Sequence, residues 1–177
     1  MKQEMQIILE VNDQAELFYE DAIQIGDHAA YVLKARHRSQ MTGLENVAES
    51  ALKVSDVLDY VKRQTARFSY WRQNFPASED VNNGSGSYEI FGERLKKYLE
   101  DTLAGMRDAI CKDKLKINDK SEKERHLRRR VYLLLIRQFL RQVVIQYEYR
   151  VSFGNTKKGD NAHAVPGTAT NAVRSER

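Results

Sequence analysis

The stretch RHLRRRVYLLLIRQFLRQVVIQYEYR, residues 125–150, decides the fold that the sequence predicts. Positions 131–136 are six apolar residues in a row, after which arginine and glutamine return at regular intervals. Just upstream, Ser121 and Glu124 have the spacing of a capping box, in which each side chain accepts a hydrogen bond from the other residue's backbone N–H. The sequence therefore predicts a long helix that begins at about residue 121.

The polar residues of this helix fall on two lines when successive residues are turned by about 100°. One line holds Arg130, Arg137, Arg141 and Glu148, and the other holds Gln138, Gln142, Gln146 and Arg150. Large apolar residues fill two flanks between the lines. One interpretation is a central bundle helix, with arginines in a solvent gap and glutamines bonded to neighbouring helices. A second is that one flank packs inside the monomer while the other meets a copy of the chain or another subunit. A third assigns the arginine line to a nucleic acid or a membrane surface.

Three more helices are predicted from apolar spacing. They cover residues from about 14 to 38, from 42 to about 71–74, and from about 87 to 112, and the second would begin at a capping-box pair, Thr42 and Glu45. Residues 76–87 are predicted to form a loop, and residues 154–177 a disordered polar tail. Four long helices with short connections predict an all-α fold, an antiparallel four-helix bundle over residues 1–153.

The composition is consistent with a single domain in a reducing compartment. The chain has 177 residues with only 9 Gly and 2 Pro, which favours helices over the sharp turns of an all-β fold. Its one cysteine, Cys111, cannot form an intramolecular disulfide. We find no export signal and no uncharged apolar run long enough to span a bilayer, so a cytoplasmic location without membrane contact is expected.

Charge is unevenly distributed along the chain. Acidic residues outnumber basic ones in residues 1–60, whereas basic residues outnumber acidic ones in residues 112–150, and the net charge is +4. This asymmetry predicts either neutralisation between packed helices or a basic face for a polyanion.

Two basic clusters are candidates for binding nucleic-acid phosphates. The first comprises Arg125, Arg128, Arg129, Arg130, Arg137 and Arg141. Its alternative is a solvated first turn, although cations at a helix N-terminus oppose the helix dipole. The second comprises Arg67, Tyr70, Trp71 and Arg72, which could stack on unpaired bases or could instead close the end of a bundle.

No catalytic motif, metal motif, glycine-rich phosphate loop or cofactor site is recognisable, and no small-molecule substrate is inferred. The sequence thus predicts a non-enzymatic accessory or assembly subunit within a larger ribonucleoprotein or protein complex. It would bind RNA or single-stranded DNA beside a protein partner. The alternative is a protein-only adaptor or homo-oligomer in which the basic surface neutralises the acidic first helix.

Overall fold

The computed structural model describes residues 2–75 and 89–154, so the predicted loop and nearly all of the predicted tail lie outside the described residues. Its α-helices are α1 (Lys2–Leu17), α2 (Tyr19–Leu33), α3 (Arg38–Ser50), α4 (Val54–Arg67), α5 (Phe91–Lys97), α6 (Leu103–Ala109) and α7 (Glu122–Gly154). Turns of 3-10 helix are η1 (Ala35–His37) and η2 (Ser69–Arg72), and π-helical turns are η3 (Tyr98–Thr102) and η4 (Ile110–Lys114). Between them the described residues form no strand, only an isolated bridge from Asn74 to Ile90, and the all-α prediction is confirmed.

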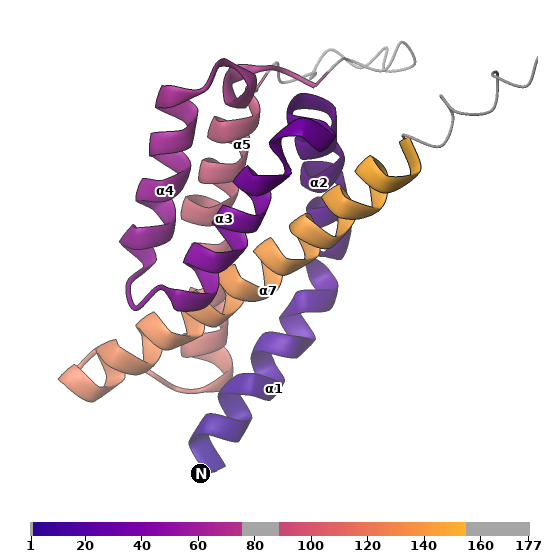
Figure 1. Cartoon of the computed structure of the whole chain (residues 1–177). Coiled ribbons are helices and arrows are strands. Elements are labelled where there is room, and N and C mark those ends of the chain that lie inside the picture. Colours follow the sequence, from indigo (N-terminus) through magenta and orange to yellow (C-terminus); the bar gives the residue numbers. More distant parts are fainter. Residues whose placement is uncertain (1, 76–88, 155–177) are drawn as a thin grey trace, which may run out of the picture.

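These elements make five rods (Figure 1). α1 and α2 form one bent rod, joined at the buried Phe18, and α5, η3, α6 and η4 follow one another without a break as another. α3, α4 and α7 are the remaining three. Because each rod reverses the direction of the previous one, the fifth rod points the same way as the first.

α7 consequently runs parallel to α1 and α2. Side chains pair along the two rods in register, with Arg130 on Glu4, Gln138 on Asn12 and Gln146 on Asp27. The separation in sequence is 126 residues for the first two pairs and 119 for the third. In an antiparallel four-helix bundle the first and last helices would point in opposite directions, so the predicted arrangement does not describe this pair.

The difference arises at residues 51–53, where the predicted second helix is divided. Ala51 and Lys53 are extended, with φ/ψ of −60°/133° and −129°/146°, and α4 begins anew with the Asp56 carboxylate accepting the N–H of Lys53 at 3.1 Å. The predicted start at Thr42 is also wrong, since α3 already begins at Arg38. Apolar spacing runs through the break without interruption, and no glycine or proline marks it.

α7 is the central rod, and residues from both of its apolar flanks are buried within the chain. Val131, Leu135 and Phe139 on one flank are fully buried, as is Leu140 on the other. Two of the three glutamines donate hydrogen bonds to the first rod, Gln138 to Asn12 at 3.3 Å and Gln146 to Asp27 at 2.6 Å. The predicted role of the glutamines as interhelical hydrogen-bond donors is confirmed for these two.

The end of the bundle near η2 is closed by aromatic side chains around His28. Trp71 is fully buried against Phe91, and the His28 ring lies edge-on to Phe75 and Phe91. His28 Nε2 donates to the carbonyl of Gln73 at 3.0 Å, while Nδ1 has no hydrogen-bond partner among the described residues. Burial in this apolar setting lowers the pKa of His28 to about 4.

Acid should therefore destabilise the protein through His28. In the unfolded chain the ring has its ordinary pKa near 6.5, so between pH 6.5 and pH 4 the unfolded state binds the extra proton and the folded state does not. The free energy of unfolding should fall by about 3 kcal/mol across this window, and His28 should not contribute to its pH dependence above pH 6.5. Urea titrations of the native protein and of His28→Gln at several pH values test this. The stability gap between the two proteins should narrow as pH falls, and a constant gap would contradict the burial of a neutral ring.

No helix of the described residues is long and apolar enough to cross a membrane.

Candidate anion-binding surface on α7

The start of α7 is fixed by the predicted capping box. The Glu124 N–H donates to Ser121 Oγ at 3.2 Å, and the Ser121 N–H donates to the Glu124 carboxylate at 3.3 Å. This pair sets the phase of the helix and hence the directions in which the arginines that follow are presented.

Three of the six arginines of α7 that were predicted to bind phosphates instead contact other groups of the same chain. Arg128 pairs with Asp119 and with Asp108, Arg130 pairs with Glu4, and Arg137 donates to the carbonyls of Ala48 and Ala51. Burial works against the charge of Arg128, but Asp108 and Asp119 raise its pKa above the ordinary value. These three arginines therefore join α7 to neighbouring parts of the chain.

Arg137 closes the break between α3 and α4. Its Nε lies 2.9 Å from the Ala48 oxygen and its terminal nitrogen 3.0 Å from the Ala51 oxygen. Carbonyls at the end of a helix lack intrahelical partners and carry partial negative charge, so a guanidinium is well suited to bind them. An arginine that the sequence presents as part of a charged line thus acts as the cap of a distant helix.

Arg125 and Arg129 remain without a carboxylate partner among the described residues. Both are exposed, as is His126 between them, and the side chain of Arg129 donates from Nε to the Arg125 carbonyl at 3.4 Å. Arg141 is also exposed and its side chain has no partner within the described part of the chain, but it lies three turns further along α7.

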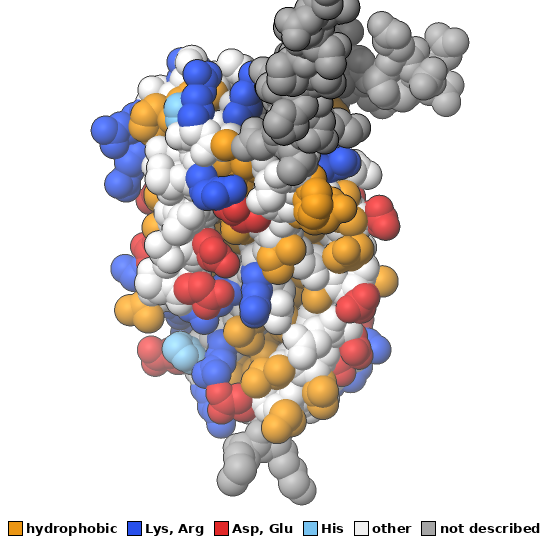
Figure 2. All heavy atoms as spheres, turned by 45° about the vertical axis from the view of Figure 1, so that its right-hand side comes forward, with side chains coloured by type: hydrophobic (Ala, Val, Ile, Leu, Met, Phe, Trp, Pro, Cys, Tyr) orange, Lys and Arg blue, Asp and Glu red, His pale blue; other side chains and the backbone are white. Residues whose placement is uncertain are grey.

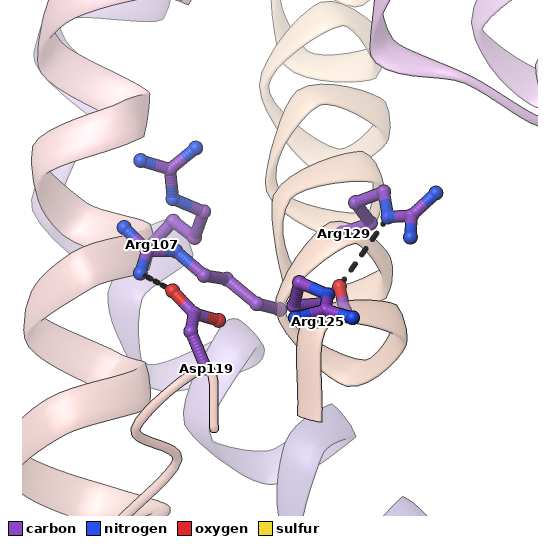
Figure 3. Close-up of a pocket in the computed structure, with 5 residues that line it drawn as sticks. Arg107, Asp119, Arg125 and Arg129 are labelled. Atoms are coloured by element: carbon purple, nitrogen blue, oxygen red, sulfur yellow. Dashed lines mark hydrogen bonds and ion pairs between the residues drawn. The ribbon is translucent and has the colours of Figure 1, made fainter. Parts of the chain in front are cut away.

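Two hollows open on either side of Arg129. The first, here called the arginine hollow, has a volume of about 270 Å³ and is lined by Arg107, Asp119, Arg125, Arg128 and Arg129 (Figure 3). Four arginines and one carboxylate therefore line it, and the guanidinium of Arg129 points away from Asp119. Asp119 is already paired with Arg128, and Arg107 lies over the Tyr132 ring at 4.7 Å and beside Asp108. The hollow offers positive charge that its own carboxylates only partly neutralise.

The second hollow, here called the leucine groove, has a volume of about 480 Å³. The lining side chains that carry nitrogen, here called its rim, are Lys53, His126, Arg129, Arg130 and Arg137. The apolar lining residues, here called its floor, are Ala51, Leu52, Leu133 and Leu134. The groove lies where the turn between α3 and α4 meets the first half of α7, so it exists only because the second predicted helix is broken.

The second predicted cluster is not assembled with the first. Trp71 is fully buried and so presents no ring face to solvent, and Arg72 caps α4 by donating to the Thr65 and Ala66 carbonyls at 2.8 and 2.9 Å. Tyr70 is stacked on His37 with ring centroids 3.9 Å apart, and Arg67 lies over the Phe68 ring. These residues lie at the end of α4, which is opposite to its start in Figure 1. The leucine groove is lined by residues just before that start, and both hollows are lined by residues of the first turns of α7.

Sequence analysis did not find Leu52, Lys53 and Arg107 as members of this surface. Leu52 and Lys53 were assigned to the middle of a continuous helix, and Arg107 comes from α6. The sequence around Lys53 holds one usable signal, Asp56 three residues later, which is the acceptor that caps α4.

Comparison of the chain with protein-family models, curated proteins and solved structures finds no match in any of the three. Within residues 2–75 and 89–154, no group of three or more His, Cys, Asp or Glu side chains could hold a metal ion.

Proposed function

We propose that the protein is a non-enzymatic accessory subunit that binds the phosphates of RNA or single-stranded DNA through the first half of α7. The observation that carries the proposal is the exposed pair Arg125 and Arg129, without carboxylate partners, at the edge of the arginine hollow. Guanidinium groups bind phosphate oxygens in a bidentate geometry. Clustered arginines bind the nucleic-acid backbone without reading its sequence.

Residues of this surface have different roles in the proposal. Arg125 and Arg129 contact phosphates directly, and Lys53 and His126 add donors at the neighbouring rim. Arg128 is held by two aspartates and keeps the wall of the hollow in place. Arg130 and Arg137 are engaged with Glu4 and with α3, so the proposal assigns them structural roles.

Neutral substitutions at Arg125 and Arg129 test the proposal, because removing their charge should be enough to weaken nucleic-acid binding. We expect the native protein to bind a single-stranded oligonucleotide at about 50 mM salt, with affinity that falls steeply as salt rises. The double variant Arg125→Ala with Arg129→Ala should bind more weakly, and the slope of log K against log salt should decrease by about 1.5. Fluorescence anisotropy across a salt series measures both quantities.

The matched control removes the same charge elsewhere. Arg36 and Arg63 are exposed residues of η1 and α4, and neither lines a hollow described above. Arg36→Ala with Arg63→Ala should leave the affinity and the salt slope nearly unchanged. Absence of binding by the native protein at about 50 mM salt, or an equal loss in the control, would refute the proposal.

A protein-only adaptor is the second candidate, because part of the basic charge is neutralised internally and apolar side chains remain exposed. Arg150 and Asp27 join α7 to α2 by two hydrogen bonds of 2.7 Å, in addition to the pair of Arg130 with Glu4. Figure 2 shows orange side chains gathered between charged ones on the face that includes α1 and α7. Exposed apolar residues of these two helices include Met5, Leu9, Ile145 and Tyr149. Such surface is typical of contacts with another protein.

A further inference from the structure

The floor of the leucine groove is not explained by binding of phosphates alone. Leu52 is 87% exposed at the tip of the turn between α3 and α4, and Leu133 and Leu134 are only half-buried. A phosphate backbone gains from positive charge but not from exposed leucine. The groove therefore has a chemical component that the proposed function has not used.

The rim of this groove consists of hydrogen-bond donors. Lys53, Arg129 and Arg130 carry positive charge, and no carboxylate lines the groove. The Ala51 carbonyl, which could have been an acceptor here, already receives a hydrogen bond from Arg137 at 3.0 Å. A suitable ligand combines an apolar face with acceptor atoms at its edge.

We infer that the leucine groove accepts an unpaired base of the strand whose phosphates are held by Arg125 and Arg129. The inference rests on the proposed function and narrows its substrate to single strands. A nucleobase has an apolar face for the leucines and carbonyl or ring-nitrogen acceptors for the donors. In a duplex, the base faces are stacked and the pairing edges are occupied, so a paired base cannot enter in this way.

Arg129 connects the two parts of the proposed site. It lines the arginine hollow (Figure 3) and also the leucine groove, so a strand that crosses α7 at this residue can place a phosphate in the first and a base in the second. Charge complementarity favours a strand over a protein segment as the ligand, since no carboxylate lines the groove and the adjoining arginine hollow is positively charged. Arg130 and Arg137 are engaged within the chain, so Lys53, His126 and Arg129 are the donors that remain for a ligand.

Because the side chains that line the leucine groove offer donors but no acceptors, some bases should bind there more tightly than others. On its Hoogsteen edge guanine offers the two acceptors O6 and N7 to one guanidinium, and uracil or thymine offers its O4 carbonyl. The same edge of adenine carries an amino donor beside N7, for which the lining side chains supply no acceptor. We expect guanine and uracil or thymine to be bound more tightly than adenine.

The test compares strands that share a backbone and differ in their bases. Anisotropy at about 50 mM salt would measure binding of the full-length protein to a guanine- and thymine-containing strand, to an abasic strand of equal length, and to the corresponding duplex. The base-bearing strand should bind about fivefold more tightly than the abasic strand, because the apolar face of the base is removed from water against the leucines. Leu52→Ser with Leu134→Ala should remove this difference while leaving the affinity for the abasic strand unchanged. Because Leu52 is highly exposed, its replacement should not affect folding. Thermal melting measures whether the replacement at Leu134 lowers stability.

Ile145→Ser is the matched control, because it removes an apolar side chain that is 59% exposed on α7 but lies outside the groove. It should leave the fivefold difference intact. Equal binding of base-bearing and abasic strands would overturn the inference and leave the proposed function standing. If neither strand binds, both fall. If an acidic leucine-containing peptide binds instead, with the same dependence on Leu52 and Leu134, the groove is a protein-binding site and the inference is overturned.

Discussion

Replacement of Arg137 by methionine should lower the free energy of unfolding by about 3 kcal/mol, because two charge-assisted hydrogen bonds are lost at once. The Arg137 guanidinium binds the Ala48 and Ala51 carbonyls, which end α3 and begin the turn to α4. Methionine retains an apolar stem of comparable length but leaves both carbonyls without this donor. Urea denaturation measures the change.

A control on the same helix is provided by Arg141, which is exposed and has no recorded partner among the described residues. Arg141→Met should change the free energy of unfolding by less than about 0.5 kcal/mol. Hydrogen exchange supplies a second measurement, since the last turn of α3 and the first turn of α4 should lose protection in Arg137→Met specifically. Equal effects of the two substitutions would show that Arg137 does not cap α3.

Gly26→Ala should destabilise the protein by about 3 kcal/mol, because α2 and α7 approach each other too closely for a side chain at this position. A Cβ on Gly26 would lie 2.6 Å from the Cβ of Gln146 and 2.9 Å from the carbonyl oxygen of Val143. Neither contact is with the far end of a flexible side chain, so relief requires the two helices to separate. Thermal and urea denaturation would both report the loss.

Gly105 offers the opposite case in the same type of element. It is exposed within α6, and a Cβ there would meet nothing within 4 Å. Gly105→Ala should therefore raise the free energy of unfolding by about 0.5–1 kcal/mol, since alanine loses less backbone freedom on folding. If Gly26→Ala were similarly stabilising, α2 and α7 would not be in the close contact described.

The sequence predicted helices where a local signal was present. Ser121 and Glu124 mark the start of α7 because both halves of that capping box lie within four residues. At Ala51 the equivalent signal is missing, and the end of α3 is instead held by Arg137, 86 residues later along the chain. Apolar spacing could not reveal the break because α3 and α4 bury faces that happen to remain in phase. One missed turn then changed the predicted direction of every later helix relative to the first.

The candidate site was also predicted only in part. The sequence located a basic cluster on the correct helix, but it could not show which arginines are neutralised. Their partners come from other rods: Glu4 from α1, Asp108 from α6 and Asp119 from the turn before α7. Trp71 was a candidate for the binding surface because arginines flank it in the sequence. It is buried instead, against Phe91 from α5. Partner assignment requires the tertiary fold.

The parallel register of α1 with α7 also bears on how the chain assembles. Glu4 and Arg130 are 126 residues apart, so α1 can meet its partner on α7 only after the residues between them have been synthesised. The α3–α4 hairpin needs only contacts close in sequence, such as that between Tyr60 and Gln40, 20 residues apart. Contacts between distant residues form slowly because a long loop has to close first. We therefore expect α1 to dock after the α3–α4 hairpin has formed, and until then its apolar side, with Ile7 and Val11, remains open to solvent or to a chaperone.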